Sequence, residues 1–235
     1  MRPDSLATRA RLIAAAEQLF ADRGIDAVSM NEVQRAAGQK NKSALQYHFG
    51  TKEQLLQAIL EKHTPGIELR RHRLLDGVEA AGTLDLRALM EALVLPVAEK
   101  LDDPDGGRAY LAIFGQIVGG PRTSTFWNDA RLGNRGADRL QRLLLRVVPG
   151  LPAPVRMARY LLVTELLFHG LSDFGRLVTS DPQLFPPSAR ELFVSNLVDV
   201  LTAVASAEVS GQTRALLPPH VTATADAADG TNETP

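Results

Sequence analysis

Apolar residues recur along this chain at intervals of three and four positions, which is the spacing of one face of an α-helix. The first such pattern includes Leu12, Ala16 and Phe20 and ends before Gly24. Further helical patterns follow over residues 52–63, 86–101, 107–118, 124–148, 154–178 and 188–207. Alternating apolar and polar positions, which indicate β-strands, are nearly absent. The sequence therefore predicts an all-α protein.

Residues 29–38 predict a short helix with clear end signals. Ser29 and Glu32 form a capping box, in which the serine hydroxyl accepts a backbone N–H and the carboxylate reaches back to the N–H of Ser29. Gly38 follows the apolar stripe of this helix, where a residue in the left-handed conformation commonly ends a helix. We therefore expect the helix to begin after Ser29 and to end before Gly38. Thr51 and Gln54 form a second capping box, which predicts the start of a later helix.

A second short helix follows the turn and completes a helix-turn-helix pattern. Leu45 and Phe49 lie four positions apart on one face, whereas Ser43, Gln46 and Tyr47 lie on the opposite face. Apolar anchors on one side allow the helix to pack on its own domain, and the polar side chains can then reach phosphates and base edges. This arrangement predicts a recognition helix that binds DNA.

Pro65 marks the expected junction between two domains. A proline inside a helix removes one N–H donor and clashes with the preceding turn, so we expect the helix that follows Thr51 to end near Thr64. Residues 1–63 then form an amino-terminal three-helix helix-turn-helix domain, and residues 64–207 form a larger helical domain in which Pro96 kinks a helix. Residues 208–235 contain few large apolar side chains, so we expect a disordered tail.

The composition narrows the class of protein. Of the 235 residues, 45% are hydrophobic and none is cysteine, which excludes a disulfide framework and a thiolate nucleophile. With neither a signal-peptide pattern nor an apolar run that could span a bilayer, we expect a cytoplasmic protein without a membrane partner. Residues 1–73 carry twelve Lys/Arg against eight Asp/Glu, and residues 74–235 carry fourteen against nineteen. A basic amino-terminal part and an acidic remainder are typical of a protein that binds DNA with one end only.

Over about residues 8–60 the chain resembles the amino-terminal DNA-binding domain of the TetR family of bacterial transcriptional regulators. The resemblance rests on the order and spacing of Arg11–Gly24, Ser29–Gly38 and Leu45–Glu53. One residue more than the usual family spacing separates the second stretch from the third, so residues 39–42 cannot be mapped. The resemblance implies a homodimeric repressor, not an enzyme and without a cofactor. Such a repressor leaves a palindromic operator in double-stranded DNA when a small, largely apolar effector binds.

The expected DNA contacts are the polar residues of the recognition helix and its flanks. Lys52 lies in the first turn of a helix, where its positive charge is unfavourable next to the helix dipole. A role in stabilising the helix therefore does not explain Lys52, and a contact to a DNA phosphate is favoured. Gln46 can pair with adenine through two hydrogen bonds. For Tyr47 and His48, the alternative to a DNA contact is packing in the core of the domain. For Lys40 and Lys42, the alternative is a turn whose side chains are only solvated. The expected set is Ser29, Lys40, Lys42, Ser43, Gln46, Tyr47, His48 and Lys52.

The last two long helical patterns are the expected dimer interface. The resemblance implies that they pack against the same pair of a second copy as a four-helix bundle, which lets two heads read two half-sites. The alternative is that both apolar stripes only close the core of one chain. The expected interface residues are Leu161, Glu165, Phe168, His169, Leu197, Val200 and Leu201.

The larger domain would enclose an effector pocket if the family pattern holds. Such pockets are mostly apolar with a few placed polar groups. The alternative is that the aromatic residues at helical spacing are ordinary core. The expected pocket residues are Met90, Tyr110, Phe114, Gln116, Trp127, Asn128 and Phe168.

Two other classes of function remain as alternatives. An enzyme could use Glu165 and His169, which lie four positions apart and could bind a metal with further ligands, but no second such pair, phosphate-binding glycine loop or catalytic triad pattern accompanies them. We therefore expect no metal site and no catalytic residue. A helix-turn-helix protein that only binds other proteins would show no salt-dependent DNA binding.

Overall fold

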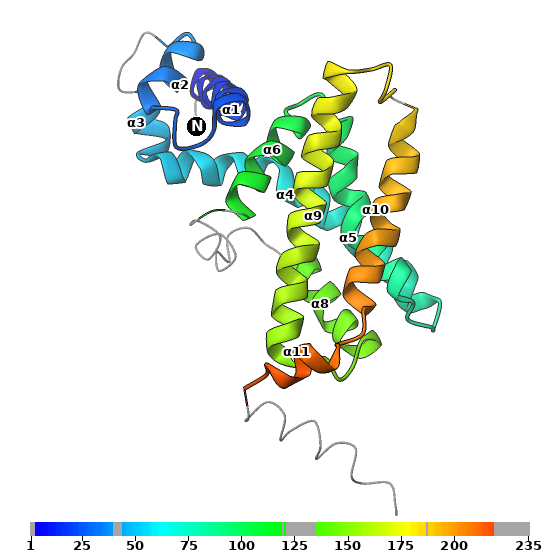
Figure 1. The fold of residues 1–235 in the computed structure, drawn as a ribbon. Helices are drawn as coiled ribbons and strands as arrows, with labels where there is room; N and C mark the ends of the chain where they lie inside the picture. The colour runs from blue at the N-terminus through cyan, green and yellow to red at the C-terminus, as the bar shows by residue number, and fades with distance from the viewer. Residues whose placement is uncertain (1–2, 40–43, 119, 121–134, 187, 219–235) are drawn as a thin grey trace, which may run out of the picture.

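The computed structural model describes residues 3–39, 44–118, 120, 135–186 and 188–218, and these residues form helices with no β-strand among them. Figure 1 shows a small head, formed by the first three helices and the beginning of the fourth, beside a larger body. The head helices are α1 (Pro3–Arg23), α2 (Met30–Ala36) and α3 (Ala44–Phe49). The long helix α4 (Lys52–Ala80) runs from the head into the body.

The body is a bundle of longer helices around an apolar core. Its elements are α5 (Leu86–Ala98), the 3-10 helix η1 (Glu99–Leu101), α6 (Gly107–Val118), α8 (Arg135–Val147), α9 (Ala153–Ser180), α10 (Ala189–Ser206) and α11 (Gly211–Ala215). Helix α6 packs against both α9 and α1, α5 packs against α4 and α10, and α8 lies against α4 and α5. Figure 1 shows α9 and α10 side by side.

The helix ends of the head follow the local signals of the sequence. Gly24 and Gly38 have φ angles of 90° and 64°, the left-handed region that ends α1 and α2. Both capping boxes form, at Ser29 before α2 and at Thr51 before α4. The predicted body helices 107–118, 154–178 and 188–207 are also found, within one or two residues at each end.

The predicted end of the fourth helix near Thr64 is wrong, because α4 continues through Pro65 for fifteen further residues. Pro65 and Gly66 lie on the exposed side of α4, as does Glu61, whose carbonyl loses its partner. Water can therefore bind that carbonyl, while buried side chains before and after the proline hold the helix in place. A domain boundary at residue 63 remains a prediction, but one helix crosses it.

The structure describes only part of the helix predicted over residues 124–148 and of the tail expected to be disordered. Of the helix predicted over 124–148, the structure describes α8 from Arg135 onward, since residues 121–134 lie outside the described part. Within the tail expected to be disordered, residues 211–215 form the short helix α11, capped by Ser210, and residues 219–235 are not described. No helix in the described part of the chain is long and apolar enough to cross a membrane.

Candidate DNA-binding surface and effector domain

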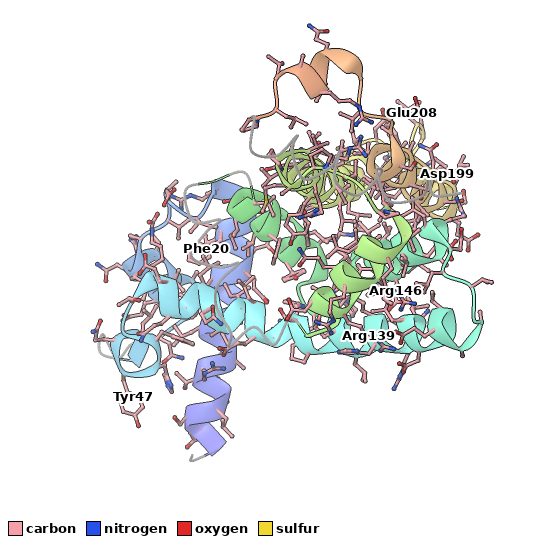
Figure 2. The ribbon with its side chains drawn as sticks, turned by 90° about the horizontal axis from the view of Figure 1, so that it is seen from below. Phe20, Tyr47, Arg139, Arg146, Asp199 and Glu208 are labelled. Atoms are coloured by element: carbon pink, nitrogen blue, oxygen red, sulfur yellow. The ribbon has the colours of Figure 1, made fainter. Side chains whose placement is uncertain are left out.

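The recognition helix α3 presents its polar side outward, as predicted. Leu45 and Phe49 are buried in the core of the head, whereas Gln46 is exposed and Tyr47 is 79% exposed. Figure 2 shows Tyr47 at the edge of the head, pointing away from the molecule, while Phe20 lies inside it. Core packing is therefore excluded for Tyr47, and its phenol is free to meet a DNA groove.

His48 lies between the outward and inward sides of α3. It is half-buried, and its ring makes an edge-on contact with Tyr47, with ring centres 5.1 Å apart. Partial burial, helped by the positive charge of Arg9, lowers the pKa of His48 below its ordinary value. The ring is therefore neutral near pH 7, with one nitrogen that donates a hydrogen bond and one that accepts.

Ser29 uses its side chain to begin α2. Its Oγ accepts a hydrogen bond from the N–H of Glu32 at 3.3 Å and donates one to Glu32 Oε2 at 2.7 Å. The Glu32 carboxylate also accepts the N–H of Ser29 and pairs with Arg23 at 2.8 Å. The hydroxyl proton of Ser29 is thus already donated, and a DNA contact by Ser29 would use its remaining lone pair.

The capping box predicts a pH dependence that is measurable at Glu32. Hydrogen bonds from the backbone and side chain of Ser29, and then from Arg23, lower the pKa of Glu32 from 4.5 to about 2. Because the folded pKa is depressed, the stabilisation by this carboxylate is present above pH 4.5 and is lost as the pH falls toward 2. An NMR titration of Glu32 should give a midpoint near 2, and Ser29→Ala should raise it. Because the alanine keeps the backbone N–H, an unchanged midpoint in Ser29→Ala would show that the Ser29 hydroxyl does not contribute to the shift.

Lys52 has a structural role that the sequence did not predict. Its Nζ donates hydrogen bonds to the carbonyls of Ile25 at 3.0 Å and Asp26 at 3.4 Å, in the connection between α1 and α2. The expectation that Lys52 lacks a structural reason is therefore wrong. Carbonyls are neutral, so its positive charge and a third N–H donor remain for a phosphate, and the DNA contact stays a prediction. Lys40, Lys42 and Ser43 lie outside the described residues.

Gln116, whose effector role remains a prediction, joins the body to the head. Its Oε1 accepts the backbone N–H of the buried Ile25 at 2.8 Å, and its Nε2 donates to the carbonyl of Phe20 at 3.0 Å. Both partners lie at the end of α1 and the start of the connection to α2. The last part of α6 therefore holds the same connection that Lys52 holds from α4.

A second junction between head and body is a cluster of ionisable side chains around the buried Glu17 and His63. Glu17 of α1 and His63 of α4 are 3% and 2% exposed, and Glu17 Oε1 lies 2.9 Å from His63 Nε2. Lys62 Nζ pairs with Glu17 Oε2 at 2.8 Å, and Asp103, in the loop before α6, lies 3.8 Å from His63 Nδ1. Removing one partner of such a group leaves a buried charge uncompensated, which is strongly destabilising. The orientation of α1 relative to α4 and the body is therefore closely specified.

Four of the predicted effector residues gather in the body core. Met90, Tyr110 and Phe168 are buried and Phe114 is half-buried. The rings of Phe114 and Phe168 stack with centres 4.1 Å apart, and Tyr110 lies 5.6 Å from Phe114. Two surface cavities, of about 430 Å³ beside α3 and about 420 Å³ beside α11, contain none of these residues. Trp127 and Asn128 lie outside the described residues, and the effector role of the set remains a prediction.

Buried polar groups on α4 next to this core were missed by the sequence analysis. Glu68 pairs with Arg71 and accepts the N–H of Gly136 at 2.6 Å, which links α4 to α8. Thr64 forms a hydrogen bond with Tyr110, whose pKa is raised by burial. Thr64, Glu68 and Arg71 follow one face of α4 at helical spacing, but the expected helix end at Pro65 hid this pattern.

The residues predicted for the dimer interface lie partly on the buried sides of α9 and α10 and partly on their exposed sides. Phe168, Leu197 and Leu201 are buried in the core of the single chain, so they offer little surface to a second copy, and their place in a dimer interface remains a prediction. Leu161, His169 and Val200 are exposed and Glu165 is half-buried. Several large apolar side chains of α9 are nonetheless exposed. Leu161, Leu162 and Leu166 flank Glu165 and His169 on its outward side, and the others are Met157, Tyr160 and Leu177.

The side chains of Glu165 and His169 are in contact on this exposed side. Glu165 Oε2 lies 3.1 Å from His169 Nε2, at the expected spacing of four residues. Among the residues that the structure describes, no three histidine, aspartate or glutamate side chains are grouped so that they could hold a metal ion. In the described structure, Glu165 and His169 make a surface contact with each other.

Two family models match the chain. The model described as bacterial regulatory proteins of the tetR family matches residues 12–59, which form most of the head. The model described as the tetracyclin repressor-like C-terminal domain matches residues 91–204 of the body.

Solved structures also resemble the chain at low sequence identity. A TetR-family regulator from Streptomyces coelicolor is 22% identical, with 88% of this chain and 98% of that chain covered and a TM-score of 0.41. A gamma-butyrolactone receptor, described as ArpA-like, is 23% identical, with 97% and 100% covered and a TM-score of 0.40. A TetR-family transcriptional regulator from Pectobacterium atrosepticum is 21% identical, with 86% and 93% covered and a TM-score of 0.35.

Proposed function

Since the chain belongs to the TetR family of bacterial transcriptional regulators, which bind DNA and are not enzymes, we propose that it is a homodimeric repressor that a small effector releases from a palindromic operator. The observation that carries this proposal is the outward side of α3, where Tyr47 and Gln46 are exposed on a helix anchored from behind by Leu45 and Phe49. A helix of this kind fits the major groove with its polar side toward the bases. The cytoplasm is the compartment in which such a protein meets its operator.

A symmetric dimer is supported by the exposed apolar side of α9. Contiguous apolar patches on a soluble protein mark sites that another surface covers. In a two-fold dimer the same patch serves both copies, and a palindromic operator has the same symmetry. The predicted contacts Leu161, Glu165, His169 and Val200 belong to this proposed interface, together with Leu162 and Leu166.

The proposed release mechanism uses the two connections between body and head. An effector that binds among Met90, Tyr110, Phe114 and Phe168 would act on α6 and α9, and α6 carries Gln116 to the connection after α1. Because α4 is continuous through Pro65, a shift of its body half also moves its head half. The effector must bind the released arrangement more tightly than the operator-bound one, since equal affinity would shift nothing.

The connection made by Gln116 can be tested without knowing the effector. Gln116→Leu should leave the buried Ile25 N–H without its acceptor and lower the free energy of unfolding by about 1–3 kcal/mol. Hydrogen exchange at the Ile25 amide should become faster than in the unchanged protein. Gln116→Glu keeps an acceptor oxygen and should restore part of the protection. Equal exchange of Ile25 in Gln116→Leu and the unchanged protein would contradict the proposed connection.

Repression itself is tested in cells. Genomic DNA fragments bound by the purified protein are sequenced, and transcription from the bound promoters is compared with and without the protein. A repressor predicts that these transcripts rise when the protein is removed. A fall would identify an activator, and fragments without a shared sequence would refute an operator-binding role.

A further inference from the structure

Arg9 lies on α1, outside the helix-turn-helix, yet its guanidinium reaches the recognition helix. Its Cζ is 5.2 Å from the centre of the Phe49 ring, on α3. Arg9 also lines the surface groove of about 430 Å³ together with Gln46, Tyr47 and His48. In Figure 2 the amino-terminal half of α1 and Tyr47 project from the same side of the head. The positive charge of Arg9 therefore lies at the edge of the outward side of α3.

The charge of Arg9 is not neutralised by the described part of the protein. Arg23 is paired with Glu32, and Lys62 with Glu17 and Asp105, whereas Arg9 forms no salt bridge with any described residue. The one acidic side chain that lines the same groove, Glu61, accepts a hydrogen bond from Gln57 at 3.2 Å. An arginine that stacks on a ring keeps the N–H donors at its edge for another partner.

We propose that Arg9 binds a phosphate of the DNA beside the segment that α3 reads, so that the DNA-binding surface extends from the helix-turn-helix onto α1. The proposal rests on the proposed function, in which α3 enters a major groove. The stack on Phe49 orients the planar guanidinium before DNA arrives, and the guanidinium fork matches two phosphate oxygens. Such a contact fixes the position of the protein on the duplex without reading its sequence.

The same side chain also acts on its neighbour His48. The positive charge of Arg9 contributes to the lowered pKa of His48, after partial burial. A phosphate bound to Arg9 would offset this charge, so protonation of His48 and binding of DNA are linked through Arg9. Removing Arg9 should raise the pKa of His48, which NMR can follow in the free protein.

The test compares two arginines of α1. Arg9 and Arg11 are two positions apart, so they point roughly 200° apart around the helix, and Arg11 donates to Thr8 Oγ1 at 3.1 Å on the exposed surface. Binding of full-length Arg9→Gln, Arg11→Gln and Arg9→Lys is measured over a salt series, on a selected operator duplex and on a random-sequence duplex. Arg9→Gln should weaken both by a similar factor of roughly ten and reduce the slope of log affinity against log salt by about one. Arg11→Gln should match the unchanged protein, and Arg9→Lys should keep most of the slope.

The outcomes separate this inference from the proposed function. If Arg9→Gln retains the slope of the unchanged protein, Arg9 is not a phosphate contact and the inference is wrong. The inference also fails if Arg9→Lys loses as much slope as Arg9→Gln, because the loss would then come from the stack on Phe49 and not from the charge. If the unchanged protein itself shows no salt-dependent binding, the proposed function fails, whatever the variants do.

Discussion

A Leu162→Glu variant is expected to be a folded monomer whose operator affinity is lower by at least about a hundredfold. Leu162 is 55% exposed on α9, within the apolar side that we propose as the dimer interface. In a two-fold dimer the substitution places an unpaired charge in the interface from each copy, at a cost of about 3–5 kcal/mol. Light scattering gives the mass of the variant, and binding to the selected operator gives its affinity.

The chain offers a matched control for this experiment. Leu69, on α4, is also 55% exposed, but it lies outside the proposed interface, so Leu69→Glu should leave both mass and affinity unchanged. Phe168→Glu should behave differently from both, because Phe168 is buried against Phe114 and a charge there unfolds the chain. A Leu162→Glu protein that remains dimeric and binds normally would place the interface elsewhere.

Tyr47→Ala and Phe49→Ala are expected to have opposite effects. Tyr47 is 79% exposed, so its removal should change the free energy of unfolding by less than about 0.5 kcal/mol. DNA binding should nevertheless weaken by about 1–3 kcal/mol, the range of a contact to a base. Phe49 is 4% exposed, and its truncation should cost about 3–5 kcal/mol of stability.

Thermal or urea unfolding and DNA binding, measured on the same samples, separate the two roles. The account requires a Tyr47→Ala protein that unfolds like the unchanged protein and binds operator weakly. If Tyr47→Ala instead unfolds early while its folded fraction binds operator normally, the outward side of α3 has been assigned wrongly.

The sequence predicted those features that local physics determines. The capping boxes at Ser29 and Thr51 and the glycine ends of α1 and α2 depend on a few neighbouring residues, and all of them form. The alternation of inward Leu45 and Phe49 with outward Tyr47 follows from helical spacing alone. Local signals of this kind do not depend on the rest of the fold.

Features that depend on distant parts of the chain could not be predicted. Pro65 is tolerated inside α4 because packing on both sides holds the helix, and no local pattern reports that packing. Gln116 and Lys52 bind backbone groups 91 and 27 positions away, and nothing in the identity of a glutamine or lysine indicates such a partner. In α9 the sides of Leu162 and Phe168 are both apolar, so periodicity does not tell which of them meets the chain's own core.

If two copies read a palindrome through paired α3 helices, binding must depend on the spacing of the two operator half-sites. The mass of the complex and its affinity are measured on the selected operator and on the same DNA with about five base pairs, half a helical turn, inserted at its centre. A dimer of this kind predicts two chains on the operator and a loss of tight binding after the insertion, because the second half-site then faces the opposite side of the DNA. One chain per site, bound equally well to both DNAs, would contradict it.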